Sequence, residues 1–172
     1  MIYYNEDKLL IRSLKEKDAI ELSKGFEEQG WDKPVSQFEK YFREQNNQER
    51  QVFIAELEGS IAGYVTLLPK AISGPFKNLP EVCDFNVLIK YQGRGIGNKL
   101  LDTLEHEVQK SSDIITLGVG MHYGYGPAQR MYVKRGYIPD GSGLWYKNKR
   151  LELHSACSNI DDLVLYLSKK LK

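Results

Sequence analysis

The most constraining feature of this sequence is a glycine-rich turn between an apolar segment and an amphipathic helix. Residues 81–89 (EVCDFNVLI) are nearly continuous in apolar and aromatic residues and predict a strand. Residues 90–97 (KYQGRGIG) follow, and apolar residues then recur at helical spacing up to about Lys110. Residues 114–119 predict a second strand. Strand, turn, helix and strand in this order favour a right-handed crossover between parallel strands.

The rest of the chain predicts strands and helices that complete an α+β fold with a mixed sheet. Strands are expected at residues 9–13, 51–57, 61–68, 144–146 and 163–168, and helices at about 19–26 and 127–135. A further helix is expected to start after Pro34 or Ser36 and to end near residues 46–47. Residues 58–60 (EGS) join two of these strands as a hairpin. Turns are expected at residues 73–75 (SGP) and 139–143 (PDGSG).

Length and composition fit one compact globular domain that spans residues 1–172. The formal net charge of +1 lacks the basic excess of a dedicated nucleic-acid binder, so we expect no nucleic-acid partner. The sequence has no apolar run long enough to span a bilayer and no signal-peptide pattern, so we expect no membrane association. Its two separated cysteines fit a reducing, cytoplasmic location.

The glycine turn predicts a site for a phosphate or pyrophosphate. Glycines before a helix let backbone N–H groups approach a ligand, and the N-terminus of a helix favours negative charge. The pattern GxxxxGK[ST] of nucleotide-hydrolysing loops is absent. The spacing Gly93-x-Gly95-x-Gly97 also differs from the dinucleotide pattern GxGxxG. A tight turn that merely needs glycine is the alternative explanation.

Residues 92–97 (QGRGIG) match the pattern Q/R-x-x-G-x-G/A, and with them the chain resembles the GNAT N-acetyltransferase superfamily. A second match lies about thirty residues later, in residues 128–137 (AQRMYVKRGY). The resemblance implies a mainly antiparallel central sheet flanked by helices, with a splayed pair of parallel strands at the cofactor site. It also implies acetyl-CoA as co-substrate. Tyr125 stands where the family often has Asn three residues before Ala128.

The resemblance also implies which residues bind the cofactor. Backbone groups of the strand before the loop would pair with pantetheine, and loop amides would hold the pyrophosphate. The residues at these positions are Val87, Leu88, Ile89, Gln92, Gly93, Arg94, Gly95, Ile96 and Gly97. A backbone N–H of Leu88 or a neighbour would stabilise the oxyanion.

Tyr132 matches the family tyrosine that protonates the coenzyme A sulfur, although a core aromatic is the alternative reading. Glu81, eleven residues before Gln92, stands where histone-acetylating relatives keep a base, so the resemblance makes it the candidate base, with a solvated carboxylate as the alternative. Asp84 is a competing base or a contact for a cationic substrate. Strand alternation places these two carboxylates on opposite faces unless a bulge intervenes. We expect Trp31 and His122 to contact the acceptor, with core packing or an ordinary surface loop as the alternatives.

The sequence therefore predicts an N-acetyltransferase in which a primary amine attacks acetyl-CoA directly in a ternary complex. The alternative is a non-catalytic acyl-CoA-binding or sensor module of the same fold. A small-molecule amine or a protein N-terminus would be the acceptor, and a homodimer is compatible with the family. Cys83 fits a buried strand residue better than a nucleophile, and no metal-binding pattern is present.

Overall fold

The computed structural model describes residues 1–171. The strands are β1 (Ile2–Glu6), β2 (Leu9–Ser13), β3 (Gln51–Leu57), β4 (Ser60–Leu68), β5 (Glu81–Val87), β6 (Ile114–Gly120), β7 (Ile138–Tyr146), β8 (Lys149–Arg150) and β9 (Leu163–Lys170). The α-helices are α1 (Asp18–Glu27), α2 (Val35–Asn46), α3 (Ile96–Gln109) and α4 (Gly126–Lys134). Two short 3₁₀ helices are η1 (Ile89–Tyr91) and η2 (Tyr123–Tyr125).

The chain divides into two compact units. Unit 1 comprises residues 1–68 and 83–107, and unit 2 comprises residues 69–82 and the chain from 108 onward. Two elements belong to both, because β5 changes unit after Val82 and α3 after Glu107. The single domain that we expect from the sequence stays a prediction.

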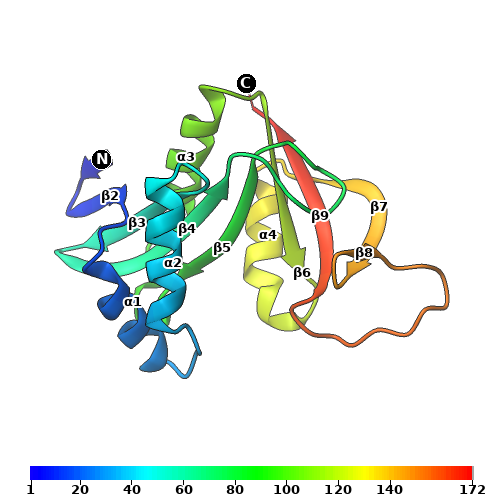
Figure 1. The fold of residues 1–172 in the computed structure, drawn as a ribbon, viewed down its shortest axis with the longest axis horizontal. Helices are drawn as coiled ribbons and strands as arrows, with labels where there is room; N and C mark the ends of the chain where they lie inside the picture. The colour runs from blue at the N-terminus through cyan, green and yellow to red at the C-terminus, as the bar shows by residue number, and fades with distance from the viewer. Residues whose placement is uncertain (172) are drawn as a thin grey trace. The chain divides into compact units, whose positions relative to one another are not determined.

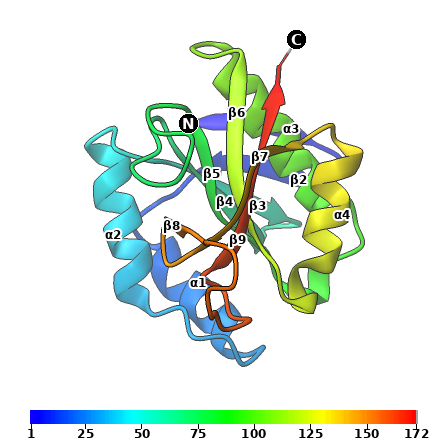
Figure 2. The same cartoon turned by 90° about the vertical axis from the view of Figure 1, so that its right-hand side faces the viewer.

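Unit 1 is a sheet in the order β1-β2-β3-β4-β5, with antiparallel pairing from β1 to β4. Helices α1 and α2 pack against each other and cover one face of the sheet (Figure 1). In Figure 2, α3 lies on the opposite side of the strands from α2. Buried residues under α1 and α2 form the core of this face: Leu14, Ala19, Leu22, Phe26, Phe38, Val52, Ile54, Ile61, Tyr64 and Leu88.

Helix α3 buries the apolar stripe that the sequence predicts. Ile96, Leu100, Leu101, Leu104 and Val108 are all buried. Positions 96, 100, 104 and 108 recur every four residues, and Leu101 lies beside Leu100, so all five side chains share one face of the helix. The start of α3, and with it the glycine turn, is therefore held in place by core packing.

Close contact between β4 and β5 depends on Gly63. A Cβ atom at Gly63 would lie 2.5 Å from the Asn86 carbonyl oxygen and 2.9 Å from the Val87 Cα atom. Real Cβ atoms do not approach so closely, so only glycine allows this approach. The residue fixes the position of β5 just before the turn.

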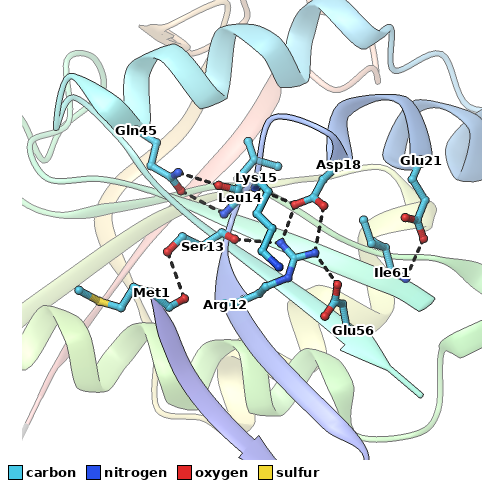
Figure 3. Close-up of polar contacts among 10 residues, drawn as sticks. All are labelled: Met1, Arg12, Ser13, Leu14, Lys15, Asp18, Glu21, Gln45, Glu56 and Ile61. Carbon is cyan, nitrogen blue, oxygen red and sulfur yellow. Dashed lines mark hydrogen bonds and ion pairs between the residues drawn. The ribbon is translucent and has the colours of Figure 1, made fainter. Parts of the chain in front are cut away.

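A buried ion pair joins β2 to the start of α1 (Figure 3). The Arg12 guanidinium donates to both oxygens of Asp18, at 2.5 and 3.0 Å, and to Glu56 in β3 at 2.5 Å. Asp18 also accepts the Lys15 N–H at 2.7 Å, which helps begin the helix. Burial alone would lower the pKa of Arg12, but its hydrogen bonds to the two carboxylates raise it.

Unit 2 has the strand order β5-β6-β9-β7-β8. The parallel pairing of β5 with β6 joins Glu81 to Thr116 and Val82 to Leu117. The other pairings in the unit are antiparallel. A long loop leads from β8 to β9, drawn in orange to red in Figure 1. None of the helices within the described residues is long and apolar enough to cross a membrane.

Over residues 1–171, the structure confirms the predicted fold class: a mixed, mainly antiparallel sheet with one parallel pair, flanked by four helices. Most predicted elements are present within one or two residues of their expected bounds. The turn expected at residues 139–143 is wrong, because these residues lie inside β7. The register of β7 with β9 shifts there, and Gly141 and Gly143 adopt positive φ, so the glycines form a bulge rather than a chain reversal.

Candidate functional site

The glycine turn lies in unit 1 and has the geometry of an anion site. Gly93 and Gly95 have φ angles of +74° and +79°, which favour glycine, and a Cβ atom at either would meet nothing within 4 Å. Helix α3 begins at Ile96, and the Lys99 N–H donates to the Gly95 carbonyl at 3.1 Å. The N–H groups of the first turn have no carbonyl partner within the helix and carry its positive dipole end. The open glycines leave room for a phosphate at this point.

The segment before the turn differs from the expected strand. Strand β5 ends at Val87, and Ile89 begins a 3₁₀ turn, so the predicted strand is two residues too long. The Leu88 N–H donates to the Ala62 carbonyl at 2.9 Å. The Ile89 N–H donates to the Gln29 side-chain oxygen, also at 2.9 Å. An oxyanion at the Leu88 N–H would have to replace the Ala62 carbonyl, and the expected role of Leu88 or a neighbour stays a prediction.

The Gln92 side chain folds back over the same segment. Its Nε2 donates to the Val87 carbonyl at 2.9 Å. This bond ties the first residue of the motif to the last residue of β5. The motif glutamine therefore shapes the turn through its side chain, in addition to any contact with a ligand.

Asp84 in unit 1 is a heavily hydrogen-bonded carboxylate. Five groups donate to it: Lys33 Nζ (2.7 Å), Gln37 Nε2 (2.8 Å), Tyr41 Oη (2.9 Å), Tyr64 Oη (2.5 Å) and Asn86 Nδ2 (2.8 Å). Burial, and then the negative charge of Asp84, raises the pKa of both tyrosine hydroxyls. With five donors on two oxygens, the lone pairs of Asp84 are all engaged in this conformation.

The backbone at Asp84 is also unusual. Its φ angle is +42°, in the left-handed region that residues other than glycine rarely adopt. This interrupts the strand alternation from which we expect Glu81 and Asp84 on opposite faces. Strained conformations of this kind persist only where the surroundings hold them, as the five donors do here.

Trp31 both packs and lines a surface hollow. Its ring stacks on Phe26 with centroids 6.0 Å apart, and 40% of the residue stays exposed. The hollow has a volume of about 370 Å³, and Glu27, Asp32 and Lys33 are among its other lining residues. This position is compatible with both expectations for Trp31, which are core packing and contact with the acceptor.

In unit 2, Glu81 and Tyr132 are both buried. Glu81 is the first residue of β5 and is in register with Thr116. Tyr132 lies on α4, and its ring meets that of Tyr137 edge to face at 5.7 Å. Burial, with a smaller contribution from Tyr125, raises the pKa of Tyr132 above its ordinary value near 10. The phenol therefore keeps its proton at neutral pH, as a general acid must.

Tyr125 and His122 anchor the loop before β9. Tyr125 Oη donates to Asp161 Oδ1 at 3.0 Å, and His122 Nε2 lies 2.9 Å from the same oxygen. The Gly124 N–H donates to His122 Nδ1 at 3.1 Å, so both ring nitrogens have partners. A hollow of about 430 Å³ is lined by His122, Asp161 and neighbouring residues. His122 thus borders an open surface hollow, with both of its ring nitrogens engaged.

Gly120 makes room for the tyrosine at the position where Asn is expected. A Cβ atom at Gly120 would collide with the Tyr125 ring. The Gly120 carbonyl accepts a hydrogen bond from Gln129 Nε2 at 2.8 Å. This hydrogen bond joins the end of β6 to α4. The Tyr125 ring packs against Gly120 at this point, and its hydroxyl contacts Asp161 in the loop before β9.

The remaining sequence candidates fall outside these clusters. Cys83 is half-buried and Cys157 is exposed. Within residues 1–171, no three His, Cys, Asp or Glu side chains gather as a metal site would require.

A family model settles the classification of the chain. The acetyltransferase (GNAT) family model matches residues 17–137, which is most of the sequence. The chain belongs to the acetyltransferase (GNAT) family. Both motifs identified from the sequence lie within the matched region. No curated protein matches the chain.

Solved structures share the fold of this GNAT family member. A protein from Salmonella typhimurium, solved with its cofactor acetyl-CoA, is 14% identical with a TM-score of 0.70, and 96% of this chain and 95% of that chain are covered. Ribosomal-protein-alanine N-acetyltransferase from Brucella melitensis is 20% identical with a TM-score of 0.69, covering 94% and 99%. An acetyltransferase from Salmonella typhimurium that modifies the N-terminal serine of a 50S ribosomal subunit protein is 9% identical with a TM-score of 0.74, covering 100% of both chains. At these identities the likeness concerns the fold.

Sequence reasoning missed the residues that surround the predicted site of this GNAT family member. Gln29 and Lys33 lie after α1, far along the chain from their contacts, which are Ile89 in η1 and Asp84 in β5. Such contacts arise from packing of α1 and α2 on the sheet and leave no local pattern. The one available signal is the position of Lys33 two residues after Trp31, which the sequence already marks as a candidate.

Proposed function

We propose that this GNAT family member transfers an acetyl group from acetyl-CoA to a primary amine by direct attack in a ternary complex. The observation that carries the proposal is the open glycine turn at the N-terminus of α3. Its backbone geometry and helix-end charge suit the pyrophosphate of coenzyme A. The family assignment supplies the reaction class.

Residues of the turn, 92–97, would hold the pyrophosphate, and residues 87–89 would lie along the pantetheine arm. Two N–H groups of that segment already have partners. A side chain is more easily displaced than a strand carbonyl. Pantetheine would therefore displace the Gln29 side-chain oxygen and accept the hydrogen bond of the Ile89 N–H in its place. Leu88 would keep its bond to Ala62.

Acetyl-CoA supplies the acetyl group as a thioester, which is activated toward amines. Tyr132 would donate its proton to the sulfur as the C–S bond breaks, and Glu81 would accept a proton from the amine, directly or through water. The raised pKa of Tyr132 makes its phenolate unfavourable, so the phenol would regain a proton from solvent after each turnover. No cysteine takes part in this scheme.

The acceptor is a small-molecule amine or a protein N-terminus. Two relatives of the same fold act on ribosomal proteins. Trp31, Asp84 and His122 are the residues that we propose for acceptor binding. Trp31 and His122 each border a hollow, and Asp84 offers a carboxylate to a cation.

The decisive experiment combines coenzyme A titration with an amine screen. Calorimetry should show that Gly95→Ala weakens coenzyme A binding at least tenfold, because a Cβ atom enters the space reserved for phosphate. Gly59→Ala is the matched control, since Gly59 has a φ of +83° and equally open surroundings but lies in the β3–β4 turn. Both variants carry similar backbone strain, so unchanged coenzyme A affinity in folded Gly95→Ala contradicts the placement.

Turnover is measured separately as release of free thiol from acetyl-CoA in the presence of amines. Thiol release that depends on the amine supports the transferase. Tight coenzyme A binding with no release across a broad panel of amines and peptide N-termini would instead indicate the non-catalytic sensor.

A further inference from the structure

The ammonium group of Lys33 sits in a pocket built for a cation. Its Nζ lies 2.7 Å from Asp84 Oδ1, 5.6 Å from the Phe26 ring centroid and 5.7 Å from that of Tyr64. Only 17% of its side chain is exposed. A carboxylate with aromatic faces is the usual chemistry for recognising an alkylammonium ion.

The carboxylate in this pocket is held rigidly by the chain. Asp84 adopts a strained backbone conformation, and Gln37, Tyr41 and Tyr64 together fix its second oxygen. The other oxygen faces Lys33 and Asn86. Without Lys33, the Asp84 carboxylate would stay oriented by its other donors and would have one side open to a cation. The carboxylate of a simple surface salt bridge has no donors that orient it in this way.

Lys33 lies on a short connection rather than within a helix or strand. It belongs to the segment between α1 and α2, where Gly30 has a φ of +79° and Pro34 precedes the first helical residue. The segment borders the hollow of about 370 Å³. Glu27, Trp31 and Asp32 line that hollow as well, so two acidic side chains and an aromatic ring stand beside the pocket. This rim favours the approach of a cation.

We propose that Asp84, Phe26 and Tyr64 form a binding site for an alkylammonium group of the acceptor, and that Lys33 occupies this site until the acceptor arrives. The inference rests on the proposed acetyl transfer and names its acceptor class. Replacing one ammonium by another preserves the charge balance around Asp84, so the exchange leaves no buried charge unpaired.

The site also restricts the chemistry of the acceptor. An amine must be uncharged to attack a thioester, and the group bound at Asp84 is an ammonium. The acceptor therefore carries a second cationic group besides the amine that is acetylated. A short aliphatic diamine is the simplest compound of this class.

The first test measures binding without catalysis. Lys33→Ala removes three of the four stem carbons and the ammonium, so n-butylammonium should bind the variant and raise its melting temperature, whereas neutral 1-butanol should not. The effect should be absent in Lys33→Ala/Asp84→Asn and in Lys40→Ala. Lys40 is the matched control because it lies on α2, is 63% exposed and pairs with Glu44 rather than with Asp84.

The second test measures acetyl transfer with Lys33→Met, which keeps most of the stem and removes the charge. The KM for 1,4-diaminobutane should fall about tenfold, because its internal competitor is gone. The KM for 4-amino-1-butanol, which has the same length but no second cation, should not change. If the Lys33–Asp84 salt bridge has only a structural role, neither KM should fall: both should stay unchanged or rise.

The outcomes separate this inference from the proposed function. If n-butylammonium binds Lys33→Ala but the enzyme acetylates no amine, the cation site is supported and the proposed acetyl transfer is wrong. Active enzyme with no preference for the diamine in Lys33→Met overturns the acceptor site. Failure of n-butylammonium to bind folded Lys33→Ala overturns it as well.

Discussion

Asp18→Ala should strongly destabilise unit 1. The side chains of Arg12 and Asp18 are only 4% and 2% exposed, and they form a bidentate ion pair. Figure 3 shows that the pair joins β2 to the first turn of α1, with Glu56 of β3 on the other side of the guanidinium. The substitution removes three hydrogen bonds at once, two from Arg12 and one from the Lys15 N–H.

The expected cost follows from burial. Breaking a buried ion pair by removing one partner costs about 3–5 kcal/mol, because the other charge stays buried without its partner. Glu56 still balances part of the Arg12 charge, so we expect a value near the lower end, about 3 kcal/mol. Arg12 Nε already has no hydrogen-bond partner, so the guanidinium has few alternatives. For a chain of this size such a loss lowers the melting temperature by about 6–12 °C.

Thermal and urea unfolding of Asp18→Ala and of a control measure the effect. Glu58→Ala is the control, because the Lys8–Glu58 pair is equally short at 2.6 Å but its side chains are 74% and 59% exposed. Solvent screens such a pair, and its loss should leave the melting temperature nearly unchanged. Equal, small effects of the two substitutions would refute the reasoning from burial. Arg12→Met in the Asp18→Ala background should recover part of the loss, since it removes the unpaired charge.

Four further outcomes are expected. Tyr132→Phe should lower kcat by about 10²–10⁴-fold with coenzyme A affinity unchanged by calorimetry, and wild-type kcat in the folded variant would exclude Tyr132 as the acid. Because burial raises the pKa of Tyr132, kcat should not fall as pH rises through 10, which a pH–rate profile checks. Cys83→Ala/Cys157→Ala should keep turnover per folded enzyme, and an acetylated Cys83 seen by mass spectrometry would argue for a covalent route. Gly63→Ala should lower stability and coenzyme A affinity together, because it displaces β5 at Val87.

The sequence predicts those parts of the fold that depend on local pattern. The stripe on α3 and the glycine turn before it are visible because helical periodicity and positive φ each leave a local trace. Strand β1 escaped prediction because Ile2–Glu6 is mostly polar or exposed and lies at the edge of the sheet. The two-residue strand β8 is too short for any periodicity.

The candidate site was predictable only in part, because only some of its features leave a local pattern in the sequence. Residues 92–97 carry a motif, but the bond from Leu88 to Ala62 depends on how β4 meets the end of β5. The five donors to Asp84 come from α2, β4, β5 and the α1–α2 connection, and no spacing in the sequence connects them. Long-range packing decides which backbone and side-chain groups remain available to a ligand. Motifs alone therefore identify the turn and leave its surroundings open.

The proposed roles divide between the two units in a way that kinetics can resolve. Unit 1 contains the glycine turn and the Asp84 pocket, both of which would bind parts of the substrates that do not react. Unit 2 contains Tyr132 and Glu81, which would exchange protons with the reacting atoms. Interactions that are equal in the ground state and the transition state change KM, whereas those that strengthen only in the transition state change kcat. Substitutions in unit 1 should therefore act mainly on KM or coenzyme A affinity, and those at Tyr132 and Glu81 mainly on kcat.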